Sequence, residues 1–131
     1  MTTRARGPFD VTLAPLPAYD STDGSTLGRM SIDKQFHGDL EATGKGEMLM
    51  AGTSTKGSAG YVAIERVRGH LHGKLGSFVL QHSGTMDHGV PSLTVTVVPD
   101  SGTEQLVGLS GSMAINIDGK QHEYVFDYSI V

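Results

Sequence analysis

The 131-residue sequence contains no cysteine, which excludes disulfides, thiolate metal sites and cysteine nucleophiles. It has no tryptophan, and no apolar run approaches the roughly 18 residues that a bilayer span needs. Ten Lys and Arg stand against fourteen Asp and Glu, without a basic stripe, so nucleic acid is not an expected partner. The basic start at residues 1–7 lacks the apolar segment of a signal peptide. We therefore expect a cytoplasmic protein that does not bind membranes.

A helical period of 3.6 residues is missing as well, and short alternating runs recur instead, separated by Gly, Pro, Asp and Asn. This pattern, in a chain with 18 glycines, is typical of an all-β protein. About eight runs can be counted, mostly joined by hairpins, and such a meander removes its exposed edges by closing on itself. The sequence predicts a closed antiparallel barrel at residues 8–131, after a disordered tail at residues 1–7. The interior of an eight-stranded barrel can hold one small ligand.

The hairpin around residues 61–88 carries the most informative side chains. A two-residue type II′ loop at Gly73-Lys74 would place glycine where φ is positive and would set Glu65 opposite His82. One face of this hairpin is polar, so the face with Glu65 and His82 is predicted to point inward. The cross-strand partner of each residue depends on which two residues form the loop. A shift of two residues in the register would change every partner but would leave each side chain on the same face.

Two further glycine signals predict turns. Asp118-Gly119 is a type I′ dipeptide, and a loop centred on it pairs Ile115 with His122. The segment Gly44-Lys45-Gly46 is read as a turn between two short strands. A polar connection is expected at residues 20–26.

Three ionisable residues are predicted on inward faces: Lys34, Glu65 and His82. Buried charges cost several kcal/mol unless they are paired, so inside a barrel these groups must meet one another, water or a ligand. A glutamate beside a histidine can act as a general acid–base pair, and Lys34 can contact a carbonyl or epoxide oxygen. These three are the candidate catalytic residues. The alternative is a structural polar plug that fixes strand register.

Five more inward residues are candidates for contacts with a ligand, because a barrel pocket is lined by aromatic and apolar side chains with a few polar groups: Tyr61, Phe78, Leu80, Tyr124 and Tyr128. For Tyr124 and Tyr128 the alternative is a position in the core. His70 and His72 have the spacing of a metal-binding pair, but no carboxylate follows at the expected distance. We expect neither a metal nor a cofactor.

Several ordered stretches resemble an uncharacterised bacterial family, the DUF3224 domain. They are DKQFHGDL at 33–40, GSAGYVAIE at 57–65, GSFVLQH at 76–82, VVPDSGT at 97–103, GLSG at 108–111 and YVFDY at 124–128. The resemblance implies a closed antiparallel calycin-like barrel, similar to allene oxide cyclase and the dirigent proteins. It implies no particular activity, since a fold does not dictate function.

Three hypotheses for function remain open. The first is a barrel that binds an apolar or mixed small molecule in its lumen. The second is a cyclase or isomerase that preorganises a flexible lipid-like or polyketide-like substrate by shape and uses one acid–base pair. The third is a structural barrel, filled by its own side chains, that works through homo-oligomer surfaces. A lumen of several hundred Å³, open at one end, would favour the first two.

Overall fold

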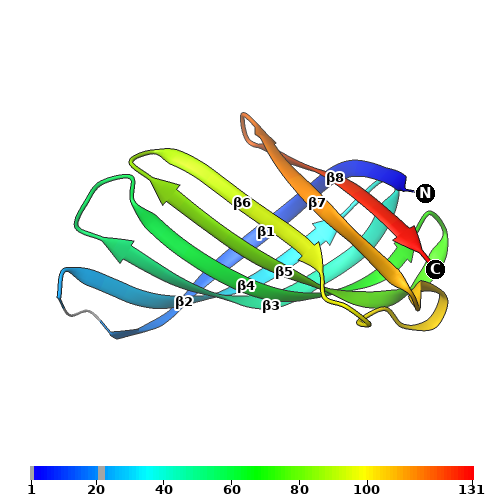
Figure 1. Cartoon of the computed structure of the whole chain (residues 1–131), viewed down its shortest axis with the longest axis horizontal. Helices are drawn as coiled ribbons and strands as arrows, with labels where there is room; N and C mark the ends of the chain where they lie inside the picture. Colours follow the sequence, from blue (N-terminus) through cyan, green and yellow to red (C-terminus); the bar gives the residue numbers. More distant parts are fainter. Residues whose placement is uncertain (1, 21–22) are drawn as a thin grey trace.

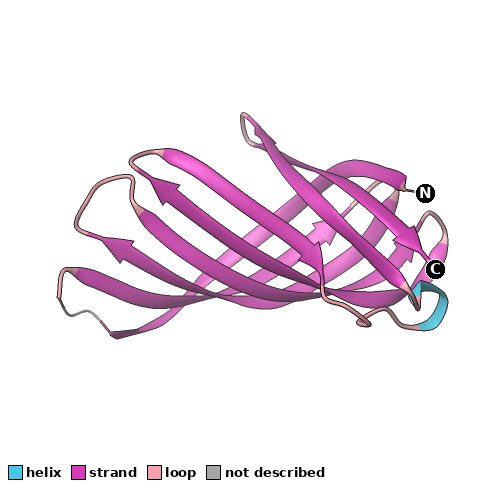
Figure 2. Cartoon of the chain, in the orientation of Figure 1, coloured by secondary structure: helices cyan, strands magenta, loops and turns pink. Residues whose placement is uncertain are grey.

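The chain forms a closed barrel of eight antiparallel strands in the computed structural model, which describes residues 2–20 and 23–131 (Figures 1 and 2). The strands follow the chain order around the wall, and β8 pairs with β1. The all-β closed antiparallel fold predicted from the sequence is confirmed. The elements are β1 (Thr3–Asp20), β2 (Ser25–Phe36), β3 (Leu40–Thr53), β4 (Ala59–Leu71), β5 (Lys74–Asp87), β6 (Val90–Val97), the 3₁₀ turn η1 (Glu104–Leu106), β7 (Leu109–Asp118) and β8 (Gln121–Ile130).

The first strand begins earlier than the sequence indicates. Residues 3–9 of β1 pair with β8 and complete the barrel, and Arg4 forms an ion pair with Asp127 at 2.7 Å. The prediction of a disordered tail is therefore wrong for residues 3–7, because β8 supplies the pairing that a short basic segment cannot reveal by itself. Met1 lies outside the described residues, as do Ser21 and Thr22 of the expected polar connection.

The predicted register of the β4–β5 hairpin is wrong by two residues. Leu71 pairs with Lys74, so the loop is His72-Gly73, and both residues have positive φ (45° and 80°). Two positive φ values define a type I′ loop, in place of the type II′ loop predicted one residue later. Glu65 consequently lies opposite Leu80, and His82 lies opposite Ala63.

The β7–β8 register differs from the prediction in the same way. Asp118 pairs with Gln121, which makes Gly119-Lys120 the loop, and Ile115 pairs with Tyr124 instead of His122. Gly119 has a φ of +62°, whereas Lys120 is not among the described residues with positive φ. This matches a type II′ loop, in which only the first central residue needs positive φ. In both hairpins the slip of two preserves which face each side chain occupies.

The predicted turn at residues 44–46 is also wrong, because β3 continues straight through it. The chain turns earlier, around Gly38, which has a φ of +94°. Gly44 and Gly46 serve a different purpose: a Cβ on Gly44 would lie 2.3 Å from Glu65 Oε2, and one on Gly46 would lie 2.0 Å from the Ile64 carbonyl oxygen. Glycine inside a strand marks a close approach, here of β3 to the Glu65 side chain.

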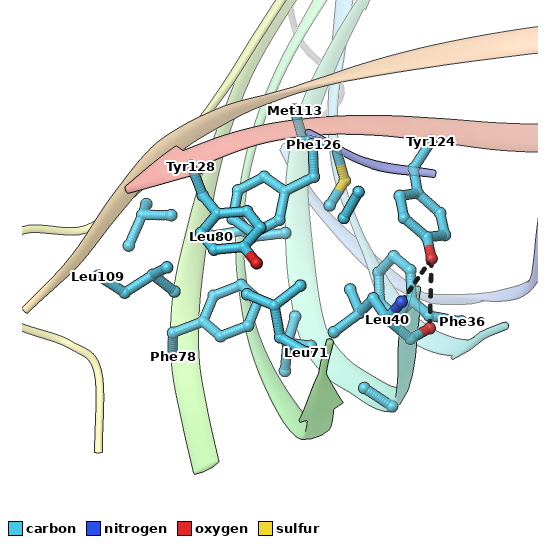
Figure 3. Packing of buried hydrophobic residues seen from close by; sticks show 14 of the residues in the cluster. Phe36, Leu40, Leu71, Phe78, Leu80, Leu109, Met113, Tyr124, Phe126 and Tyr128 are labelled. Carbon is cyan, nitrogen blue, oxygen red and sulfur yellow. Dashed lines mark hydrogen bonds between the residues drawn. The ribbon is translucent and has the colours of Figure 1, made fainter. Parts of the chain in front are cut away.

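The apolar core fills one half of the barrel, which we call the closed half. It lies toward the end where Figure 1 shows the N- and C-termini. Aromatic rings dominate its packing, with Phe78 stacked on Phe126 at 5.7 Å between centroids (Figure 3). The Tyr124 hydroxyl donates to the His37 carbonyl at 2.7 Å and accepts from the Leu40 N–H at 2.8 Å, which ties β8 to the β2–β3 turn.

The other half, which we call the open half, has exposed apolar side chains on its inner face. Leu93 is 41% exposed and Ile117 is 66% exposed, and both line the lumen. Leu93 shares the inward alternation of Val95 and Val97, which are buried toward the closed half. The lumen is therefore packed at one end and accessible to solvent at the other.

Candidate functional site

Lys34, Glu65 and His82 meet where the packed core ends. Glu65 Oε1 accepts hydrogen bonds from Lys34 Nζ at 3.0 Å and from His82 Nε2 at 2.8 Å. The three side chains come from β2, β4 and β5, and they are 6%, 0% and 4% exposed. Although Glu65 and His82 are not direct cross-strand partners, they are diagonal neighbours on the inner face, a separation that long side chains can bridge.

The environment of Glu65 favours its ionised form. Burial alone would raise the pKa of this carboxyl, but the hydrogen bond from His82 and the charge and hydrogen bond of Lys34 outweigh burial and hold the pKa below its usual value. Glu65 therefore remains a carboxylate that balances the Lys34 ammonium. The ammonium also lies over the rings of Phe9 and Phe36, at 5.1 and 5.6 Å from their centroids, where a cation is attracted to the ring face.

One oxygen of this carboxylate is left without a partner. Glu65 Oε2 is the buried side-chain polar atom, within residues 2–20 and 23–131, that makes no hydrogen bond. Such groups are rare in folded proteins, because each one costs about 1–3 kcal/mol. Oε1 thus accepts both hydrogen bonds that described side chains give to Glu65, and Oε2 accepts none.

A cavity of about 180 Å³ lies in the lumen beside these three residues. Lys34 and His82 reach its wall, and His122 is a second imidazole on it; the rest of the lining is mainly apolar: Phe9, Val11, Leu13, Ile32, Met48, Tyr61, Ala63, Leu93, Ile115 and Ile117. A volume of about 180 Å³ is below the several hundred Å³ that would enclose a whole ligand, so this cavity can surround only one end of a larger molecule.

The barrel wall is incomplete around the open half. A single residue pair, Thr96 with Ser112, joins β6 to β7, and the pairing of β1 with β8 stops at Phe9. Figure 1 shows the tip of the short β7–β8 hairpin standing away from β6. Beyond these points β1 and β6 each have an edge that pairs with no described strand.

Proline protects both of these edges. Val98 N–H donates to Val79 O and His37 N–H donates to Pro8 O, which fixes the side toward which each backbone group of β6 and β1 points. By alternation, the nitrogens of Pro91 and Pro15 face the unpaired sides, where another residue would present a free N–H. Proline at an edge prevents further strand pairing. Pro15 and Pro91 therefore each remove one backbone donor that a further strand would need for pairing at these edges.

Methionine is concentrated on the inner face of the open half. Met48 lines the cavity, and Met30, Met50 and Met86 have the inward alternation of Ile32, Met48 and His82 in their strands. Flexible thioether side chains are common on surfaces that accommodate apolar partners of variable shape. This half of the lumen therefore has an apolar inner surface rich in flexible side chains.

The structure separates the candidate ligand contacts into two groups. Tyr61 lines the cavity, and its burial raises the pKa of its hydroxyl. Phe78 and Leu80 are packed in the closed half, away from the cavity lining. Burial there also raises the pKa of Tyr124 to about 12, and its hydroxyl is occupied by backbone groups.

The fifth candidate, Tyr128, also lies in the closed half. Its hydroxyl is 2.5 Å from His72 Nδ1. The hydroxyl thus joins β8 to the β4–β5 turn and does not reach the cavity. His70, at the same hairpin, is exposed.

Several residues of the open half were missed by sequence reasoning. His122 shares the inward alternation of Tyr124, so its position on the cavity wall was readable from the strand pattern. The four methionines were readable in the same way. The exposure of Leu93 and Ile117 could not be predicted in this way, because alternation shows which face a side chain occupies and not whether the lumen is filled at that depth.

Two structural findings concern metals and membranes. Across residues 2–20 and 23–131, no three His, Asp or Glu side chains are grouped closely enough to hold a metal ion. The same part of the chain contains no helix with the length and apolar character required to cross a bilayer.

Comparison with known proteins identifies relatives without a known activity. A family model described as a protein of unknown function, DUF3224, matches residues 5–128. A solved structure of a DUF3224 protein of unknown function from Shewanella oneidensis MR-1 is 52% identical and superposes with a TM-score of 0.95, over 100% of this chain and 99% of that one. No curated protein matches the sequence.

Proposed function

Since the chain belongs to the DUF3224 family, whose function is unknown, we propose its function from the site itself: it binds a small, mainly apolar molecule in the open half of the barrel. One observation carries this proposal. A buried ionic group of Lys34, Glu65 and His82 lies at the inner end of an apolar lumen whose side chains are exposed to solvent. Concave apolar surfaces with a few convergent polar groups are the usual form of ligand sites.

The size of the cavity bears on the shape of the ligand. About 180 Å³ accommodates one end of a molecule beside Lys34 and His82. The remainder would lie against the methionines and leave through the unpaired wall between β6 and β1. An elongated, flexible ligand fits this arrangement better than a compact one.

Binding of Nile red, an uncharged apolar dye, tests the proposal. Wild-type protein is expected to bind it saturably, with one dye per chain and an increase in fluorescence. Leu93→Asp is expected to weaken binding by about tenfold or more, because it places a charge on the apolar inner face. Leu75→Asp is the matched control: Leu75 is 38% exposed, close to the 41% of Leu93, but it is not on the cavity wall. Equal binding by both variants, or none by wild type, would contradict the proposal.

A cyclase or isomerase activity is the second candidate, and the contact between His82 and Glu65 favours it. A carboxylate hydrogen-bonded to one imidazole nitrogen orients the ring and stabilises its protonated form, as a general base requires. His82 also lines the cavity, within reach of a bound molecule. His82→Gln distinguishes the two functions: an enzyme would lose turnover of a bound substrate while keeping its affinity, whereas a carrier has no turnover to lose.

A further inference from the structure

The Lys34 ammonium has unused hydrogen-bond donors beside the cavity. An ammonium carries three N–H donors. Lys34 donates one to Glu65 Oε1, and its other interactions with described residues are with the Phe9 and Phe36 ring faces, which attract the charge without accepting a conventional hydrogen bond. The described residues therefore leave donors that an acceptor atom of a ligand can use.

The charge of Lys34 is already balanced by Glu65. A carboxylate ligand at Lys34 would gain the attraction of the ammonium, but it would also be repelled by Glu65, which shares that ammonium at 3.0 Å. It would further lose its hydration on entering an apolar cavity. An uncharged acceptor, such as a carbonyl oxygen, gains the hydrogen bond without the repulsion from Glu65 and with a much smaller cost of lost hydration.

One cation and one carboxylate set this balance. The ionisable side chains around the cavity are Lys34 from β2, Glu65 and Tyr61 from β4, His82 from β5 and His122 from β8. Glu65 already pairs with the Lys34 ammonium, so a ligand carboxylate would place a second negative charge beside a single ammonium.

From these donors and charges we propose that the site selects a molecule with an apolar chain and one uncharged hydrogen-bond acceptor, of the ketone, aldehyde or ester class, whose oxygen binds Lys34 Nζ. This inference rests on the proposed function, because it concerns the ligand of the same lumen. It adds the identity of the polar group and the exclusion of the corresponding acid.

Three probes of about ten carbons test the proposal by displacing Nile red at about pH 8: 2-decanone, decanoate and decane. The ketone is expected to compete about tenfold or more tightly than the other two, the effect of one hydrogen bond to a charged donor. In the double variant Lys34→Met/Glu65→Gln, which removes both charges together, the ketone and decane are expected to compete equally. The infrared carbonyl stretch of bound 2-decanone should lie at lower frequency in wild type than in this variant, a readout that does not depend on affinity or on stability.

The outcomes separate the two proposals. If Nile red binds but decanoate competes best, or all three probes compete equally, the selection of an uncharged acceptor is wrong and apolar binding stands. An unchanged carbonyl stretch in the double variant would also contradict the role of Lys34. If neither the dye nor any probe binds to wild type, the proposed function itself fails.

Discussion

Replacing Glu65 with leucine is expected to lower the free energy of unfolding by about 3–5 kcal/mol, because it leaves the Lys34 ammonium buried without its counter-charge. Leucine is close to glutamate in size, so the loss does not reflect a large cavity. His82 would lose the acceptor for its Nε2 hydrogen as well. Urea unfolding followed by circular dichroism measures the change. The comparison requires that the unfolding free energy depend on urea concentration with the same slope in the variant and in wild type.

The triple variant Lys34→Met/Glu65→Leu/His82→Leu is the control for this prediction. Removing a whole buried ionic group is often neutral or stabilising, whereas removing one partner is not. The triple variant should therefore unfold at a denaturant concentration close to, or above, that of wild type, and it should lose the preference for 2-decanone. A cost below about 1 kcal/mol for Glu65→Leu would show that Lys34 is not held by Glu65. A triple variant as unstable as the single one would favour a structural plug.

Filling the cavity with a phenyl ring is expected to weaken binding strongly while the fold is kept. Ala63 is buried on the cavity wall, opposite His82 in the β4–β5 ladder. An apolar cavity of about 150 Å³ can hold benzene, so the side chain of Ala63→Phe fits within about 180 Å³. Nile red affinity should fall by about thirtyfold or more, which corresponds to roughly 2 kcal/mol, and the thermal midpoint should not fall.

Ala14→Phe provides the comparison on the outside of the same half. Ala14 is exposed on β1, and its neighbours Leu13 and Val11 show by alternation that it points away from the lumen. This variant should bind the dye as wild type does. If Ala63→Phe also binds the dye with wild-type affinity and remains folded, the dye does not occupy the cavity and binds elsewhere on the protein.

The inward direction of Lys34, Glu65 and His82 could be predicted because it depends only on alternation within each strand. The contact between Glu65 and His82 was predicted on a register that the structure contradicts. The contact exists nevertheless. The observed register differs from the predicted one by two residues, which makes Glu65 and His82 diagonal neighbours, and their side chains still meet at 2.8 Å. The face of the sheet that a side chain occupies can thus be predicted from the sequence more reliably than its cross-strand partner.

Other features could not be predicted because they depend on contacts distant in sequence. Gly44 and Gly46 have the composition of a turn, and only the nearness of Glu65 explains them as strand residues. The split of the lumen arises because β6 pairs with β7 only at Thr96 and Ser112 and β1 pairs with β8 only as far as Phe9, which leaves Leu93 exposed. Phe78 and Leu80 share the inward alternation of the site residues, and their depth toward the closed half makes them core.

The methionines offer the most direct test of the central claim, that a ligand occupies the open half of the barrel. In protein with ¹³C-labelled methionine methyl groups, addition of 2-decanone is followed by nuclear magnetic resonance. Met30, Met48, Met50 and Met86 should shift with a common saturation curve, while Met113, packed in the closed half, should not move. No shift at the four open-half methionines at saturating ketone, or a shift confined to Met113, would contradict the account.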